Sequence, residues 1–335
     1  MKVGIYLPSF AYKRDEIDHV GRLHRWVTLA EKLGFDSLWV TDHLLRAEAM
    51  YATSWLEPLS TLAFASSITH SVQLGTGVLL LPYRHPVLLA KELATIQQLS
   101  SGRLILGVGT GWSPDEMRAM GTSVSVRGRR TDEVLSATRA LLTGERVTHR
   151  GSFFEFDDVV IDPASQSVPI WVGGGSQVAH EASVERPILA PAVARRIASS
   201  DGWFIRPTAS PEQILADWEL LRPYIADAGR RPEDLVIAHG QWLHLTTESD
   251  PAKARAIQHR YARGVVSGQR PPALLEEYYL FGTLDEILEG CQRRARVGVE
   301  YLIIHPYTDE VEQLELWGEE LLPALHAMLP NRVKS

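Results

Sequence analysis

The chain has 335 residues, of which 45% are hydrophobic and 22% charged, a balance that is typical of globular enzymes and excludes a disordered or fibrous protein. The length suits one α/β barrel with insertions, so residues 1–335 are expected to form a single domain. A net charge of −7 gives no basic field for nucleic acid or an anionic membrane, and we expect neither as a partner.

The amino-terminal segment gives no sign of export. Residues 2–8 read KVGIYLP, which is strand-like and lacks the apolar stretch of a signal peptide. No apolar run approaches the roughly 18 residues of a membrane span. The one cysteine, Cys291, can form no disulfide within the chain, which fits a reducing compartment. We therefore expect a cytoplasmic protein.

Eight short runs rich in Val, Ile and Leu recur along the chain, bounded by Gly, Pro or Asp. Most of them are apolar without strict alternation, as in parallel strands that helices cover. They alternate with helical patterns, which favours a (β/α)8 TIM barrel over an open doubly wound sheet. The runs are Lys2–Ser9, Ser37–His43, Gln73–Pro82, Arg103–Trp112, Pro169–Gly175, Asp201–Pro207, Leu235–Thr246 and Tyr301–Tyr307.

Two of the intervening helices have clear ends. Residues 19–33 show helical spacing and stop at Gly34, a typical C-terminal cap. Residues 86–99 begin with a proline in the first turn. Both segments are therefore predicted to be helices of the barrel's outer ring.

Two connections are longer than the rest and predict insertions after strands 4 and 7. The first, residues 113–168, contains GSFFEFDDVVIDP (Gly151 to Pro163), which predicts an appended hairpin. The second, residues 248–300, contains Ser267 to Phe281, a segment expected to act as a lid over the barrel. The helices predicted within these connections are 130–142, 252–265 and 284–297.

In a barrel of this kind the active site forms at the carboxyl ends of the strands. That rule selects a short set of candidates. They are Ser9, Phe10, Asp42, His43, Tyr83, Arg84, His85, Gly109, Thr110, Gly111, Trp112, Gly174, Gly175, Ser176, Arg206, His239, Gln241 and His305.

Two glycine clusters point to a phosphate-bearing planar ligand. VGGGS, ending at Ser176, would expose backbone N–H groups to a phosphate if a helix follows, although it could equally be a tight turn. GVGTGW, ending at Trp112, lacks dinucleotide-binding spacing and is better explained as flat backbone beneath a ring. Arg195, Arg196 and Arg206 could each pair with the phosphate or remain solvated.

Asp42 and His43 end the second strand, where a histidine can act as a hydrogen-bond donor, acid or base. A structural histidine oriented by its aspartate neighbour is the alternative. His239, Gln241 and His305 are single polar residues in apolar strands, more often satisfied core groups than catalysts. The metal-binding, paired-cysteine, P-loop and GxSxG motifs are missing from the sequence, so no metal site is predicted and hydrolase functions are disfavoured.

Long segments of the chain resemble the luciferase-like flavin monooxygenase family, which includes coenzyme F-420-dependent oxidoreductases. The longest is Glu57 to Trp112, and GFDSLWVTDHLL, RGRRTDEVLSATRALL, PIWVGGGS and VGVEYLIIH also match. The resemblance implies a barrel with flavin or deazaflavin at the strand ends, and a non-prolyl cis peptide between Gly77 and Val78. It further implies a homo-oligomer. The ring would lie among Asp42, His43, Gly77, Val78, Gly109 and Thr110, and the phosphate at Gly174, Gly175 and Ser176.

One stretch departs from the family pattern. Between Gln177 and Ser200 the chain carries about ten additional residues, which bring Arg195 and Arg196 near the expected phosphate end. Arg196 is therefore a further candidate for cofactor binding.

The favoured hypothesis is a two-component monooxygenase that takes reduced FMN from a separate flavin reductase and uses dioxygen on a small organic substrate. His43 would hydrogen-bond the reacting oxygen, and Asp42 would orient His43. The alternative is hydride transfer with coenzyme F-420, whose polyglutamyl tail favours a basic groove. A non-catalytic flavin-binding protein and a metal-dependent barrel hydrolase are the remaining hypotheses.

Overall fold

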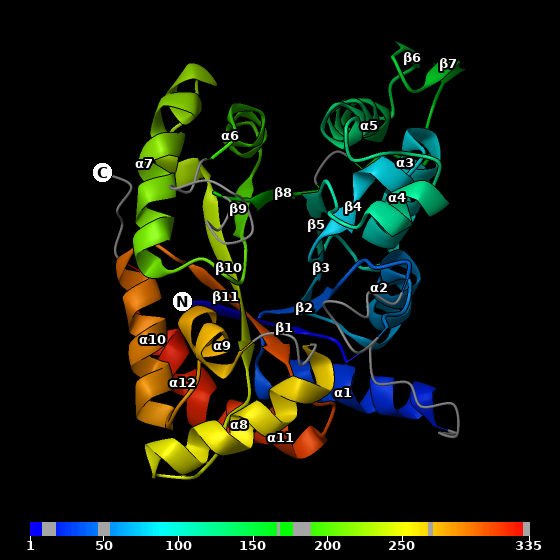
Figure 1. Ribbon diagram of the computed structural model, residues 1–335. Helices are drawn as coiled ribbons and strands as arrows, with labels where there is room; N and C mark the ends of the chain where they lie inside the picture. Colours follow the sequence, from blue (N-terminus) through cyan, green and yellow to red (C-terminus); the bar gives the residue numbers. More distant parts are fainter. Residues whose placement is uncertain (9–17, 46–53, 166–167, 177–188, 267–270, 331–335) are drawn as a thin grey trace.

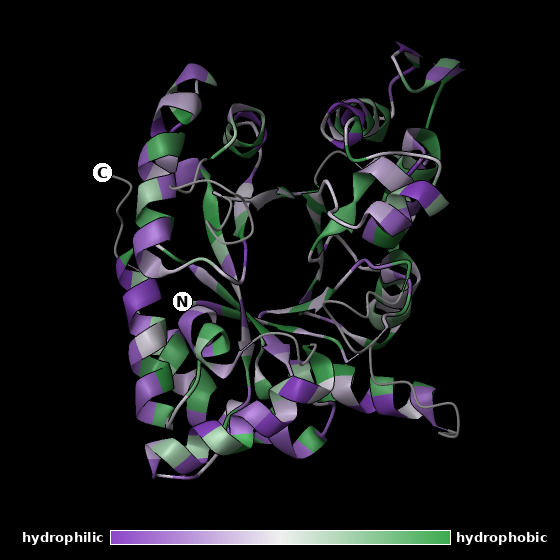
Figure 2. Ribbon diagram, in the orientation of Figure 1, coloured by the Kyte–Doolittle hydropathy of each residue, from purple (hydrophilic) through white to green (hydrophobic). Residues whose placement is uncertain are grey.

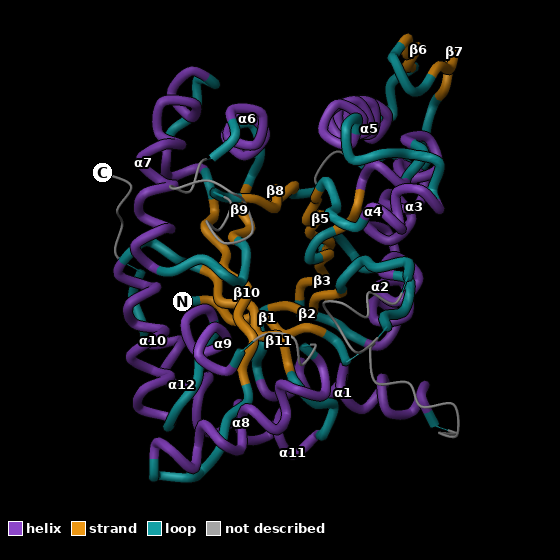
Figure 3. The backbone as a smooth tube through the Cα atoms, in the orientation of Figure 1, coloured by secondary structure: helices purple, strands orange, loops and turns teal. Residues whose placement is uncertain are grey.

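The eight predicted strands form one closed parallel barrel (Figures 1 and 3). The computed structural model describes residues 1–8, 18–45, 54–165, 168–176, 189–266 and 271–330. Hydrogen-bonded neighbours follow the order β3-β2-β1-β11-β10-β9-β8-β5-β4, and pairing of β3 with β5 closes the ring. The predicted (β/α)8 architecture is thereby confirmed. The strands are β1 (Lys2–Tyr6), β2 (Ser37–Val40), β3 (Gln73–Thr76), β4 (Leu79–Leu80), β5 (Leu104–Gly109), β8 (Ile170–Gly174), β9 (Gly202–Ile205), β10 (Val236–Leu243) and β11 (Tyr301–Pro306).

The barrel interior is filled by aromatic side chains. Trp39 packs against Trp171 with ring centroids 5.2 Å apart and against Phe204 at 5.4 Å. Glycines make room for these rings, since a Cβ at Gly75 would lie 2.5 Å from Trp39 and one at Gly202 2.5 Å from Trp171. The part of the interior that these rings fill is therefore a packed core.

Helices cover the barrel on the outside, and Figure 2 shows apolar residues along the strands with polar stripes on the helices. The predicted helices at residues 19–33 and 86–99 are confirmed at both ends, as α1 and α3. Asp18 caps the first turn of α1, and Gly34 ends the helix with a φ of 94°. The ring is built from α1 (His19–Leu33), α2 (Pro58–Ile68), α3 (Pro86–Leu99), α5 (Arg127–Leu142), α6 (Pro191–Ala198), α7 (Pro211–Asp227), α10 (Leu284–Arg296), α11 (Val311–Leu316) and α12 (Leu322–Ala327).

The insertion after the fourth barrel strand consists of α4 (Pro114–Ala119), α5 and a two-stranded hairpin that projects from the barrel in Figure 1. The hairpin pairs β6 (Val147–Arg150) with β7 (Glu155–Val159), so its first strand precedes the predicted segment. That strand was missed because its half-buried and exposed residues alternate and few of them are apolar. Helix α5 likewise starts three residues before the predicted position.

The insertion after the seventh barrel strand contains α8 (Pro251–Val265) and α9 (Pro272–Tyr278). Part of the predicted lid, residues 267–270, lies outside the described residues, and most of the remainder forms α9. Leu275 and Tyr278 of α9 pack in a cluster with Trp242, and Trp55 packs against the same cluster. A movable lid stays a prediction. Within the described segments, no helix is long and apolar enough to cross a membrane.

Candidate active-site cavity

A cavity of about 580 Å³ opens where the barrel strands end, within the size range of small-molecule sites. Its lining brings together nearly all predicted cofactor and catalytic residues, which come from the ends of β5 and β8, the segments that follow β2, β5 and β8, the β3–β4 break and α6. Ser176 is the exception. The predicted residues that line the cavity are Asp42, His43, Gly77, Val78, Gly109, Thr110, Gly174, Gly175 and Arg196.

One wall of the cavity is nearly free of side chains. The peptide bond between Gly77 and Val78 is cis, as the family resemblance implied. Tyr6 donates from its hydroxyl to the Gly77 carbonyl at 2.7 Å, and a Cβ at Gly109 would lie 2.5 Å from Val78 Cγ2. These glycines therefore let backbone and Val78 form a flat surface, which suits a planar ring.

His43 lies on another wall, and a buried carboxylate holds its ring. Nδ1 is 3.2 Å from Oε1 of Glu116, and the same oxygen accepts the amide N–H groups of Leu44 at 2.9 Å and Leu45 at 3.1 Å. Burial acts to raise the pKa of Glu116, but these donors outweigh it and hold the pKa below its ordinary value. The rings of Trp55 and Trp112 flank His43, with centroids 4.9 and 5.7 Å away.

The proposed orientation of His43 by Asp42 is wrong. Asp42 instead accepts the Leu80 amide at 2.8 Å and an Arg84 guanidinium N–H at 3.0 Å, both through Oδ2. Burial is the largest influence and raises the pKa of Asp42, although Arg84 opposes it. Asp42 is a residue of the cavity lining, and its Oδ1 is buried and has no hydrogen-bond partner among the described residues. Asp42 therefore keeps one acceptor atom that a ligand could use.

The glycine-rich turn after β8 lines the far end of the cavity. A Cβ at Gly175 would lie 3.8 Å from Arg206 Nε, and a Cβ at Gly174 would lie 2.6 Å from Val193 of α6. Arg206 and Arg196 both line the cavity, so guanidinium groups lie beside the expected phosphate position. The helix expected to follow VGGGS falls on residues 177–188, which lie outside the described residues.

Ser176 does not contribute to the cavity as the sequence suggested. It is fully buried, its amide donates to Asp217 Oδ2 at 2.7 Å, and its hydroxyl also donates to Asp217. Because both donors already serve a carboxylate, Ser176 in this arrangement has none left for a phosphate. Arg196 is also engaged, as it pairs with Asp132 and donates to the Gly128 carbonyl.

The other candidates divide between core and cavity. His239 and Gln241 are fully buried core groups that bond the carbonyls of Arg206 and Pro207, although Nδ1 of His239 has no hydrogen-bond partner among the described residues. His305 lines the cavity, and burial lowers its pKa to about 3. His85 caps α3, Tyr83 donates to Glu116 at 3.4 Å, and Ser9 and Phe10 lie outside the described residues. The described part of the chain contains no group of three or more His, Cys, Asp or Glu side chains that could hold a metal ion.

Comparison with known proteins agrees with this geometry. Residues 1–301 match the family described as luciferase-like monooxygenase. The chain belongs to the luciferase-like monooxygenase family. Among its relatives, the F420-dependent glucose-6-phosphate dehydrogenase of Nakamurella multipartita is 30% identical over 326 residues, which cover 90% of this chain and 91% of the relative.

Two solved structures are similar along almost their whole length. Monooxygenase RslO1 from Streptomyces bottropensis is 26% identical with a TM-score of 0.77, covering 96% of this chain and 99% of that chain. An F420-dependent secondary alcohol dehydrogenase in complex with an F420-acetone adduct has a TM-score of 0.78 at 20% identity, and the match covers 97% of this chain and 98% of that chain. At this identity the similarity supports the fold. These luciferase-like relatives are oxidoreductases, and they include both dehydrogenases and monooxygenases.

Sequence reasoning missed several residues of this luciferase-like cavity. Glu116 lies 73 positions after His43, in an SPDEM segment of the first long connection. Arg127, the first residue of α5, lines the cavity, and so do Trp55, which precedes α2, and Trp242 of β10. No local signal distinguishes these residues from surface or core residues of the same types.

Proposed function

We propose that this chain is a coenzyme F-420-dependent oxidoreductase that exchanges a hydride with a small, largely apolar alcohol or its carbonyl counterpart. The observation that carries the proposal is His43 in the cavity wall, with its Nδ1 held by the ionised carboxylate of Glu116. The dehydrogenase that is 30% identical along 90% of the chain supports the choice of cofactor.

The residues present fit such a cofactor. The flat surface at Gly77, Val78 and Gly109 would lie against the ring, and the orphaned Oδ1 of Asp42 could accept a hydrogen bond from it. Gly174 and Gly175 with Arg206 would hold the phosphate. When bound, the deazaflavin supplies the hydride acceptor or donor.

His43 handles the proton that accompanies the hydride. A proton on Nδ1, assigned from the bond to Glu116, leaves the lone pair on Nε2. Nε2 accepts the hydroxyl proton of the alcohol while the hydride on the alcohol carbon passes to the bound coenzyme. The carbonyl compound is the product. The imidazolium so formed is stabilised by the negative charge of Glu116, and in reverse it returns the proton to the carbonyl oxygen.

Apolar residues around His43 indicate the substrate class. Trp55 and Trp112 lie against the imidazole and limit the access of water to it. Trp112 itself and the apolar neighbours of His43 and Trp55 in the sequence, Leu44, Leu45 and Leu56, are each 38–43% exposed. A hydrophobic rim of this kind matches an aliphatic or aromatic alcohol better than a sugar phosphate.

The test is a pair of cofactor titrations followed by turnover. We expect micromolar binding of coenzyme F-420, weaker binding of FMN, and loss of the oxidised deazaflavin absorbance when secondary alcohols are added. His43→Gln should retain cofactor binding and lose turnover. Tight binding of FMN alone, with no deazaflavin reduction by any alcohol, would overturn the proposal.

A two-component FMN monooxygenase is the second candidate, and the aromatic lining favours it. Tyr6 and His305 stack at 3.5 Å and Trp242 stacks on His305 at 4.7 Å, which gives the cavity a dry wall suited to oxygen chemistry. RslO1, at 26% identity, is a monooxygenase. This candidate predicts substrate-dependent dioxygen uptake when a separate flavin reductase supplies reduced FMN. A non-catalytic flavin protein would bind the cofactor and show neither activity.

A further inference from the structure

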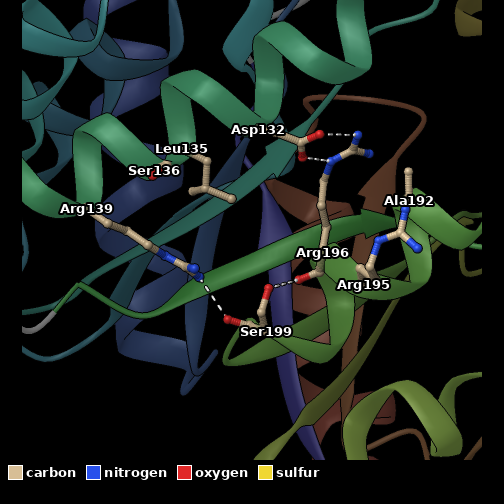
Figure 4. A pocket seen from close by; sticks show the side chains of 8 residues that line it. All are labelled: Asp132, Leu135, Ser136, Arg139, Ala192, Arg195, Arg196 and Ser199. Carbon is tan, nitrogen blue, oxygen red and sulfur yellow. Dashed lines mark hydrogen bonds and ion pairs between the residues drawn. The ribbon is translucent and has the colours of Figure 1, made fainter. Parts of the chain in front are cut away.

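A second concave surface lies outside the cavity, between α5 and α6 (Figure 4). Two adjoining hollows of about 350 and 620 Å³ share Arg139 and Ser199 and form one groove, called here the α5–α6 groove. Its described lining contains four arginines but only two aspartates, on a chain whose net charge is −7. These charged residues are Asp132, Arg139, Arg195, Arg196, Asp201 and Arg230.

The arginines differ in how fully they are engaged. Arg196 is paired with Asp132, and Arg230 donates to the carbonyls of Ser200 and Asp234 and lies 3.9 Å from Asp201 Oδ1. Arg139 makes one bond, to the Ser199 carbonyl at 3.1 Å. Arg195 is exposed and forms no ion pair or side-chain hydrogen bond with any described residue. The groove therefore retains donors and positive charge that the chain itself does not use.

Helix α6 separates this groove from the active-site cavity. Val193 and Ala190 line the cavity beside Gly174, whereas Ala192, Arg195 and Ser199 line the groove. Arg196 lines both, and Figure 4 shows its guanidinium against Asp132 of α5 with Arg139 and Arg195 on either side. The expected phosphate end of the cavity thus adjoins the basic groove across a single eight-residue helix.

We propose that the α5–α6 groove binds the anionic glutamyl tail of the deazaflavin coenzyme, with Arg195 and Arg139 pairing with its carboxylates. This inference rests on the proposed function. Arginine suits the role because its planar guanidinium binds carboxylates through paired N–H groups. Burial lowers the pKa of Arg139. Asp201 opposes this shift and Arg230 adds to it, and the pKa stays below its ordinary value, so an added carboxylate would favour the charged guanidinium. FMN, which has a phosphate but no tail, would leave the groove empty.

The experiment compares two forms of the coenzyme by fluorescence titration: F-420 with its glutamates, and the same molecule trimmed to the phospholactate. Wild-type protein should bind the glutamylated form about tenfold more tightly, with the preference shrinking at high salt. Arg195→Glu combined with Arg139→Gln should abolish the preference, and Arg195→Lys should largely keep it. Arg296→Glu, on an exposed residue of α10, is the control for overall charge.

The outcomes separate this inference from the proposed function. Equal binding of both forms by wild type, or equal loss for both forms in the double variant, would refute the tail site while leaving F-420 dependence intact. Failure of both forms to bind would refute the proposed function and the inference with it. In a further experiment, γ-linked triglutamate should compete with the glutamylated coenzyme for binding. Equal competition by inorganic phosphate at the same concentration would identify a simple anion site and overturn the proposal. Melting curves establish that each variant is folded.

Discussion

Replacing Glu116 with glutamine tests the chemical core of the proposed function. Glutamine can still accept the amides of Leu44 and Leu45 and hydrogen-bond Nδ1 of His43, so the geometry should survive while the charge is lost. At an effective dielectric constant of about 20, unit charges 3 to 4 Å apart interact by about 4 kcal/mol. Because a neutral hydrogen bond remains, we expect a net loss of about 2 to 4 kcal/mol for the imidazolium form.

That loss should appear in one kinetic parameter. Glu116→Gln is expected to lower kcat by about 30-fold to 1000-fold, with little change in KM or in coenzyme affinity. The assay follows deazaflavin reduction by the best secondary alcohol in stopped flow, which separates hydride transfer from product release. Glu116 acts through His43, so it is a positioning residue rather than a catalytic one.

The chain offers a matched control for this variant. Glu133 of α5 also accepts several backbone amides, those of Ser152, Phe153 and Phe154 in the hairpin turn, and it lies 3.4 Å from His149 Nε2, but it does not line the cavity. Glu133→Gln should cost similar stability, about 1 to 2 kcal/mol, and leave kcat unchanged. Equal effects of both variants on kcat, or a normal kcat for Glu116→Gln, would refute the role assigned to Glu116.

Three further variants test the site and its support. Gly109→Ala places a Cβ 2.5 Å from Val78 Cγ2, so coenzyme affinity measured by titration should fall about tenfold or more in a folded protein; unchanged affinity would argue against a ring on this wall. Arg84→Met leaves the carboxylate of Asp42 buried without its cation and should lower the free energy of unfolding by about 3 to 5 kcal/mol in urea, with recovery in the Asp42→Asn double variant. Backbone amides lower the pKa of Glu31 to about 2 despite some burial, so its stabilisation is present above about pH 4.5 and is lost as pH falls toward 2. Glu31→Gln should therefore cost about 1 kcal/mol at pH 7 and little at pH 2.5, and a cost that does not depend on pH would contradict this account.

The barrel could be predicted from the sequence because its signals are local. Each buried strand is a short apolar run, and α1 and α3 begin and end at residues whose capping chemistry is visible in the sequence, such as Gly34 and Pro86. The hairpin strand at Val147–Arg150 carried too few apolar residues to be recognised. The break in the third strand at Gly77 followed from family resemblance alone, since no local pattern marks it.

The partners of the site residues could not be predicted, because they meet only when the barrel closes. Asp42 was assigned to its neighbour His43, yet its cation is Arg84, 42 positions away, and the carboxylate at His43 comes from 73 positions away. Ser176 was assigned to a phosphate, but Asp217, 41 positions later, takes both of its donors. In each case the sequence identified a polar group at the correct strand end and gave no information about which distant side chain satisfies it.

Carboxylates that accept several N–H or O–H donors recur throughout this molecule, and this limits what a buried acid alone can indicate. Glu31, Glu133 and Asp217 each hold a loop in place by the same means that Glu116 uses toward Leu44 and Leu45. Hydrogen bonding and burial therefore do not distinguish an acid that supports chemistry from one that fixes a turn. What distinguishes Glu116 is its contact with a histidine that lines the cavity, because only there can its charge act on a proton in transit. The same criterion sets Arg195 apart among the arginines: its charge has no partner in the described chain, and it faces a groove that adjoins the cofactor's expected position.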